Sequence, residues 1–128
     1  MSTTPWIESV PIQVVGGPTV LINYAGLRIL TDPTFDEPGE YQTPVPGFSL
    51  VKTQGPSVSL AEIGGVDLVL LSHDEHDDNL DRSGRELLKT VPLTVTTIGG
   101  SRRLGGTAKG LAVWESIRLI AIQSVGGV

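Results

Sequence analysis

Apolar and polar residues alternate along the first third of the chain in the short runs that are typical of strands. Residues 12–15, 19–24 and 27–31 are rich in β-branched and aliphatic side chains, which suit the half-buried surface of a sheet. A Gly-Gly-Pro segment and an Ala-Gly pair separate these runs, and such residues are typical of turns. We therefore predict three sequential antiparallel strands.

Strands and short helices alternate in the rest of the predicted structure. An apolar run at residues 66–71 predicts a buried strand, and residues 93–97 and 117–122 predict two more. Residues 59–63 predict a single helical turn that stops at the following glycine pair. Residues 81–89 predict a helix whose N-cap is Asp81, and capping alone explains that aspartate.

Two segments that contain several glycines predict a turn and a long loop. Residues 98–101, Ile-Gly-Gly-Ser, lack the lysine and the glycine spacing of a phosphate-binding loop. We interpret them as a turn from a strand into a short helix that ends at Gly105. Residues 36–58 carry four prolines and three glycines, and they predict a long irregular segment of the kind that forms a lid or a binding loop.

Composition narrows the class of protein. The 128 residues suit one domain with a hydrophobic core. A formal net charge of -5 does not support binding to nucleic acid or to an anionic membrane surface. The absence of cysteine excludes disulfides and thiolate ligands. No apolar run approaches the ~20 residues of a membrane-spanning helix, and the amino terminus lacks a secretion signal. A cytoplasmic protein is expected.

Both histidines of the protein lie in the loop that follows the strand predicted at 66–71. In this segment (residues 72–81, the histidine loop), His73 and His76 are accompanied by five carboxylates, at positions 74, 75, 77, 78 and 81. Imidazole and carboxylate are ligands that suit zinc and similar ions, and so many negative charges repel one another unless a cation lies among them. The alternative is an acidic loop that is only solvated.

The chain from residue 19 to about residue 114 resembles the amino-terminal half of a metallo-β-lactamase-fold hydrolase, in the lactonase-like branch. The resemblance lies in the Thr-Asp-Pro turn at 31–33, followed later by a Ser-His…Asp loop directly after a buried strand. The family signature at that place is HxHxDH. The histidine loop matches it with substitutions.

Two alignments of the signature are open. The one that we prefer matches His76-x-Asp78 to its second part, with Asn79 in place of the last histidine and His73 one residue further upstream than usual. The alternative begins at His73 and takes Asp77 as the signature aspartate, with carboxylates in both later histidine positions. In either alignment at least one family ligand is exchanged, so one ion at most is expected.

The resemblance implies a set of functional residues. His73, His76 and Asp78 would bind the metal, which would be zinc, with manganese or iron as alternatives. Asp78 and Asp77 would be the catalytic carboxylates, and Asp32 of the Thr-Asp-Pro turn would orient a ligand without binding the ion. The implied activity is attack by a metal-activated water on a small-molecule ester, lactone, amide or phosphoester. An aspartate that only caps a turn is the alternative for Asp32.

The resemblance also implies an incomplete fold. We expect residues 1–128 to form a single, truncated domain of α+β class, which is half of an αββα sandwich with one mostly antiparallel or mixed sheet and short helices. The sequence contains no third histidine, and family members carry further ligands in a second half. The sheet is then expected to have an uncovered apolar face, which favours self-association or a second-half partner. An inactive fragment that acts, if at all, as a partner-binding sheet module is the alternative function.

Overall fold

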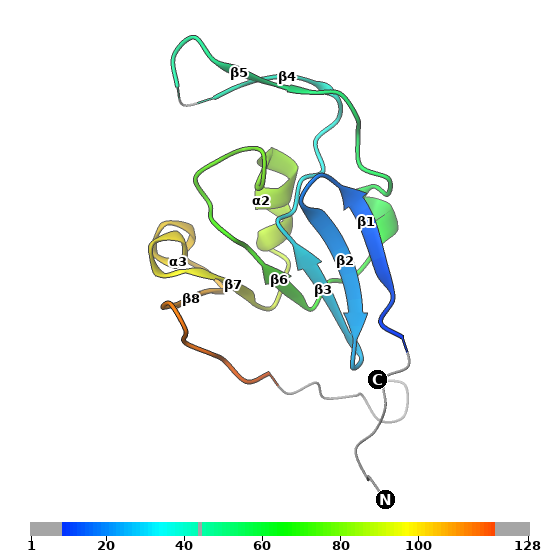
Figure 1. Ribbon diagram of the computed structural model, residues 1–128, viewed down its shortest axis with the longest axis vertical. Helices are drawn as coiled ribbons and strands as arrows, with labels where there is room; N and C mark the ends of the chain where they lie inside the picture. Colours follow the sequence, from blue (N-terminus) through cyan, green and yellow to red (C-terminus); the bar gives the residue numbers. More distant parts are fainter. Residues whose placement is uncertain (1–8, 44, 120–128) are drawn as a thin grey trace, which may run out of the picture.

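The amino-terminal part of the sheet is an antiparallel meander. The computed structural model describes residues 9–43 and 45–119, and its first strands are β1 (Ile12–Gly16), β2 (Thr19–Tyr24) and β3 (Leu27–Thr31) (Figure 1). β2 and β3 have the predicted bounds. Ala25 and Gly26 between them have φ angles of 52° and 81°, as a tight hairpin turn requires. The prediction of three sequential antiparallel strands is confirmed.

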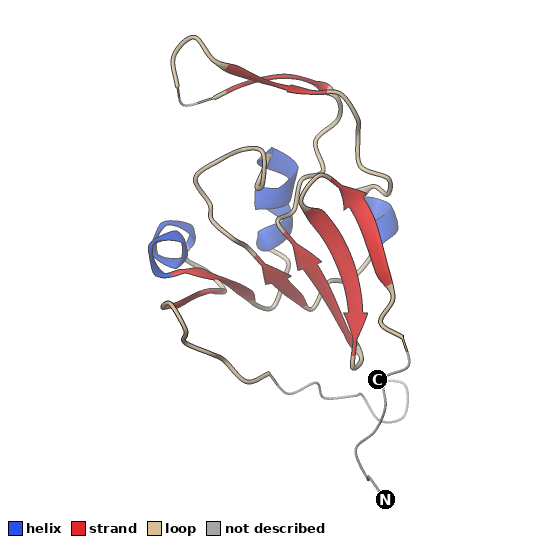
Figure 2. Cartoon of the chain, viewed as in Figure 1, coloured by secondary structure: helices blue, strands red, loops and turns tan. Residues whose placement is uncertain are grey.

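Three parallel strands continue the sheet beyond β3. They are β6 (Leu68–Leu70), β7 (Thr94–Thr97) and β8 (Ala108–Leu111), in the order β1-β2-β3-β6-β7-β8. Parallel neighbours need a crossover connection, which α2 (Arg82–Leu88) supplies between β6 and β7 and α3 (Ile98–Leu104) supplies between β7 and β8. The short α1 (Leu60–Ile63) precedes β6. The fold is therefore α+β, with a mixed sheet and short helices, as predicted (Figure 2).

The core lies on the face of the sheet that the helices cover. Leu30 of β3 and Val69 of β6 are fully buried there. They belong to one cluster with Ile63 of α1 and Leu88 of α2, and Leu104 of α3 packs against it. Because alternate strand residues point to the same face, the neighbours of these residues along each strand point to the other side.

That other face is open and apolar in the part of the chain that the structure describes. Ile12 and Val14 of β1 are each 62% exposed, and Leu70 of β6 is 40% exposed. A shallow hollow of about 380 Å³ lies at its edge, where Val95 and Leu111 are among the lining residues. Among the described residues, this face is therefore uncovered at Ile12, Val14 and Leu70, whereas Leu68 on the same side of β6 is buried.

Three sequence-based assignments differ from the structure. The segment at 36–58 is not irregular throughout, since it contains the hairpin of β4 (Gly39–Gln42) and β5 (Ser49–Lys52) (Figure 1). The helix placed after the turn at 98–101 instead begins at Ile98. The strand predicted at 117–122 is wrong for residues 117–119, which are not in a strand, and its remainder lies outside the described residues. Among the described residues, the last strand of the sheet is β8.

Close packing explains why the first residues of α3 and the strand β8 were not recognised. A Cβ at Gly100 would lie 2.9 Å from the Thr97 hydroxyl oxygen, and a Cβ at Gly110 would lie 2.6 Å from the Ile98 Cα. Glycine is needed at both places because the chain segments touch there, whereas from sequence alone glycine indicates a break.

Within the described residues, no helix has the length and apolar character needed to cross a bilayer.

Candidate metal centre

The histidine loop leaves the sheet beside the end of β3. β3 and β6 are parallel, with Thr31 opposite Leu70, so the residues that follow both strands meet at one edge of the sheet. The Asp32 carboxylate accepts hydrogen bonds from the Ser72 backbone N–H at 2.7 Å and from the Ser72 hydroxyl at 2.8 Å. Two segments 40 residues apart in sequence are thereby joined at the base of the loop.

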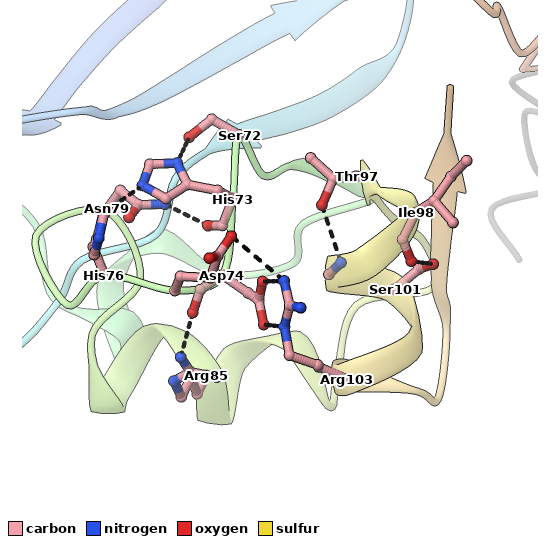
Figure 3. A network of polar contacts seen from close by, with 12 residues as sticks. Ser72, His73, Asp74, His76, Asn79, Arg85, Thr97, Ile98, Ser101 and Arg103 are labelled. Atoms are coloured by element: carbon pink, nitrogen blue, oxygen red, sulfur yellow. Dashed lines mark hydrogen bonds and ion pairs between the residues drawn. The ribbon is translucent and has the colours of Figure 1, made fainter. Parts of the chain in front are cut away.

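The three proposed ligands come together above this junction. His73 Nε2 lies 3.1 Å from His76 Nδ1, and one atom each of His73, His76 and Asp78 lie within 4.8 Å of one another. The two imidazole rings meet edge to face, with centroids 5.0 Å apart and an interplanar angle of 82°, and Figure 3 shows them side by side. His73 is half-buried, and the other two side chains are exposed.

These distances fit one tetrahedral ion closely for the histidines and loosely for Asp78. With zinc–nitrogen distances of about 2.1 Å, two ligand atoms in tetrahedral geometry are about 3.4 Å apart. The two imidazole nitrogens already have nearly that separation. At the outer limit of 4.8 Å, the Asp78 oxygen would have to move by roughly 1 Å, which a side-chain rotation of an exposed aspartate provides.

The contacts of Ser72 assign the proton of His73. The Ser72 hydroxyl has one proton, which it donates to Asp32, and its oxygen lies 2.9 Å from His73 Nδ1. A carboxylate only accepts, so the Ser72 oxygen accepts from His73 Nδ1–H. His73 Nε2 then keeps its lone pair, which is the form that binds a metal. Before an ion binds, this lone pair accepts from His76 Nδ1–H. Metal binding therefore requires the exposed His76 to carry its proton on Nε2.

Asp32 lies beside the histidine loop, but its backbone does not have the expected conformation. Because Pro33 follows, we expected Asp32 to be extended, whereas its φ is +30°. Its N–H donates to the Leu70 carbonyl at 3.0 Å and its own carbonyl accepts from the Thr19 hydroxyl at 2.6 Å. These tertiary contacts outweigh the local preference. Such strained residues concentrate at functional sites.

Asn79, which replaces the last family histidine in the preferred alignment, braces the loop. Its side-chain amide donates to the His73 carbonyl at 2.5 Å, and the residue is 5% exposed. Its amide oxygen has no hydrogen-bond partner in the structure. The Asn79 side chain thus holds the backbone of His73 beside the imidazole pair (Figure 3).

Asp74 points away from the histidines and pairs with an arginine that sequence reasoning missed. Arg103 of α3 donates to its two oxygens at 2.8 and 2.6 Å, and Arg85 of α2 donates to its carbonyl at 2.6 Å (Figure 3). The bonds from Arg103 lower the pKa of the Asp74 carboxyl below its ordinary value of 3.8, against the effect of burial. The only signal in the sequence was the basic pair at 102–103.

Two further carboxylates of the loop have separate environments. Asp81 is the N-cap of α2, as predicted, and accepts from the Gly84 N–H at 2.8 Å. Asp77 is not part of the group of three ligand atoms. It lines a groove of about 1370 Å³ between the β4–β5 hairpin and α2, together with Asp78, Lys52 and other residues. The groove thus reaches the candidate metal centre at Asp78.

The sheet order and the one-sided helices are those of one half of a metallo-β-lactamase αββα sandwich. Two solved structures are similar to this fold. The first is isothiocyanate hydrolase from Delia radicum gut bacteria, with a TM-score of 0.61, 22% identity, and coverage of 79% of this chain and 41% of that one. The second is CmlA, a diiron β-hydroxylase from Streptomyces venezuelae, with a TM-score of 0.53, 20% identity, and coverage of 84% and 22%.

These similarities show the fold, and the chain spans less than half the length of either neighbour. No family model matches the sequence, and no curated protein matches it. The function therefore has to be argued from the geometry of the histidine loop.

Proposed function

We propose that this chain carries the metal site of a metal-dependent hydrolase, with His73, His76 and Asp78 as ligands of one divalent ion, and zinc as the first candidate. The observation that carries the proposal is the 3.1 Å approach of His73 Nε2 to His76 Nδ1. The hydrogen bond of His73 Nδ1–H to Ser72, which is itself held by Asp32, keeps the lone pair of His73 on Nε2 for an ion. One structural neighbour is named as a hydrolase and the other as a diiron enzyme, which supports this class.

The chemistry follows from the type of site. A divalent ion held by these groups supplies a Lewis acid that makes water nucleophilic near neutral pH, which suits an ester, lactone, amide or phosphoester. The protein residues bind and orient. His73 is held in one tautomer, and Asp78 places a negative charge beside the imidazoles. Asp77 lines the same groove as Asp78, and we assign it the role of general base.

Zinc titration of the full chain tests the proposal. We expect one equivalent to bind by calorimetry, and zinc at 100 times its dissociation constant to stabilise the fold by about 2.7 kcal/mol. His76→Ala and Asp78→Asn should each weaken binding. Glu86→Gln is the control, because it removes one carboxylate whose ion pair is with the exposed Lys89 at the end of α2 and which lies outside the ligand group. Binding to a His73→Ala/His76→Ala variant as tight as to the wild type would refute the proposal.

A second candidate function has one specific observation in its favour, the open face of the sheet. Ile12, Val14 and Leu70 are exposed there, and in an αββα sandwich this side of a sheet packs on another sheet. We propose that the face is covered by a second sheet, from another copy of the chain or from a second-half partner. This function requires no metal, so zinc binding separates the two candidates.

A further inference from the structure

The ion pair between Asp74 and Arg103 links the histidine loop to α3. Asp74 is 4% exposed, and Arg103 meets its two oxygens with two parallel N–H groups, at 2.8 and 2.6 Å. Such bidentate pairs fix orientation as well as position. The partners are 29 residues apart in sequence, so the bond connects the loop to the last turn of α3.

α3 is shaped to receive this carboxylate. A Cβ at Gly100 would lie 3.2 Å from one Asp74 oxygen, closer than most real Cβ contacts, so the glycine lets Asp74 lie against the helix. Arg103 is held in turn by Glu75, whose carboxylate is 3.5 Å from its guanidinium. On the opposite side, Arg85 of α2 donates to the Asp74 carbonyl at 2.6 Å. Asp74 is therefore fixed through both its side chain and its backbone.

His73 lies between this clamp and the Asp32 junction. Ser72, on one side of it, is bound to Asp32 through two hydrogen bonds. Asp74, on the other side, is bound to Arg103. With both neighbours held, the backbone of His73 has little freedom, and its imidazole stays 3.1 Å from that of His76. Removal of either anchor frees one end of this three-residue segment.

We propose that Arg103 is a positioning residue for the metal centre: acting through Asp74, it holds His73 in place before an ion arrives. The proposal rests on the proposed function for its metal readout, but it also concerns the metal-free chain. Ligands that are held in place bind an ion more tightly, because binding does not have to order them. Loss of a residue that supports a metal ligand typically weakens metal binding by about 10- to 100-fold.

Two substitutions and one control test the proposal in the full chain. Arg103→Met keeps the apolar stem and removes both hydrogen bonds, and Arg103→Lys keeps the charge but loses the two-pronged geometry. Arg102→Met is the control, since Arg102 is exposed on the same helix turn. The readouts are the imidazole nitrogen NMR signals of metal-free protein, the zinc dissociation constant from competition with a chelator, and circular dichroism to verify folding.

We expect both Arg103 variants to change the imidazole signals of His73 and His76. Zinc affinity should fall by about 10- to 100-fold in Arg103→Met and by less in Arg103→Lys, while Arg102→Met behaves as the wild type. Folded Arg103 variants with wild-type signals and wild-type affinity would overturn the proposal, even if their melting temperature falls. If Arg103→Met does not fold, Arg103→Lys decides by the same two readouts. If the wild type binds no zinc, the proposed function fails, and the metal-free signals alone decide the positioning role.

Discussion

Asp32→Asn is the most informative single change, because at nearly constant size it replaces one accepting oxygen by a donating NH2 group and removes one negative charge. Asparagine has nearly the same size and tolerates positive φ, so the backbone at 32 is not strained further. Its oxygen still accepts from the Ser72 N–H, but its amide nitrogen now donates to the Ser72 oxygen. The Ser72 proton must then point to His73 Nδ1. His73 thus moves its own proton to Nε2, the atom that would bind the ion.

The size of the effect follows from the hydrogen bonds. Asp32 makes two contacts of 2.7 and 2.8 Å with Ser72, and Ser72 contacts His73 at 2.9 Å. Zinc binding to the variant must first restore the wild-type tautomer at the expense of this network. Comparable losses in supporting residues weaken metal binding by about 10- to 100-fold, which equals about 1.4 to 2.7 kcal/mol.

The assay is a zinc competition titration combined with imidazole nitrogen spectra of the metal-free protein. Asp67→Asn serves as the control, because Asp67 also accepts a backbone hydrogen bond, from Arg28 at 2.8 Å, but lies at the other end of β6. We expect weaker binding and an exchanged pattern of protonated nitrogens in His73 for Asp32→Asn only. Equal zinc affinity in both variants, with unchanged His73 signals, would refute the tautomer argument.

Three further predictions concern stability and association. Gly84→Ala should lower the free energy of unfolding, measured in urea, by roughly 1–3 kcal/mol or more, because a Cβ at residue 84 would lie 2.0 Å from the Pro33 carbonyl oxygen. A Cβ at Gly65 would have no atom within 4 Å, so Gly65→Ala should be nearly neutral. Since the pKa of Asp74 is lowered in the folded state, its ion pair stabilises the protein above pH 3.8 and this contribution is lost as pH falls below that value. The stability difference between wild type and Asp74→Asn should therefore shrink on acidification, and a constant difference would contradict this. Val14→Asp on the open face should abolish any self-association seen by analytical ultracentrifugation. Val51 is 63% exposed on the β4–β5 hairpin, so Val51→Asp should leave self-association unchanged. Equal effects of the two substitutions would exclude the open face as the interface.

Local patterns predicted those parts of the fold that local interactions determine. The bounds of β2 and β3 follow from β-branched runs bounded by turn residues, and Asp81 caps α2 because an aspartate at that place satisfies free backbone N–H groups. The β4–β5 hairpin was missed because its strands are only four residues long and lie among prolines and glycines, which from sequence alone indicate an irregular loop.

The charges of the histidine loop show what sequence could not provide. From sequence, five carboxylates in one loop indicate a need for a cation. In the structure, Arg103 neutralises Asp74 and contacts Glu75, and Asp81 is occupied by the backbone of α2. Only Asp77 and Asp78 are left as free acidic neighbours of the histidines. The case for a metal thus depends on the imidazole pair more than on the number of negative charges.

The site-specific test of the whole account is X-ray absorption at the zinc edge on the one-to-one complex of zinc with the full chain. We predict two imidazole nitrogens at about 2.0–2.1 Å, with oxygen ligands completing a tetrahedral shell. Loss of one imidazole should follow His76→Ala. A zinc spectrum with oxygen ligands alone, unchanged by that substitution, would contradict the account.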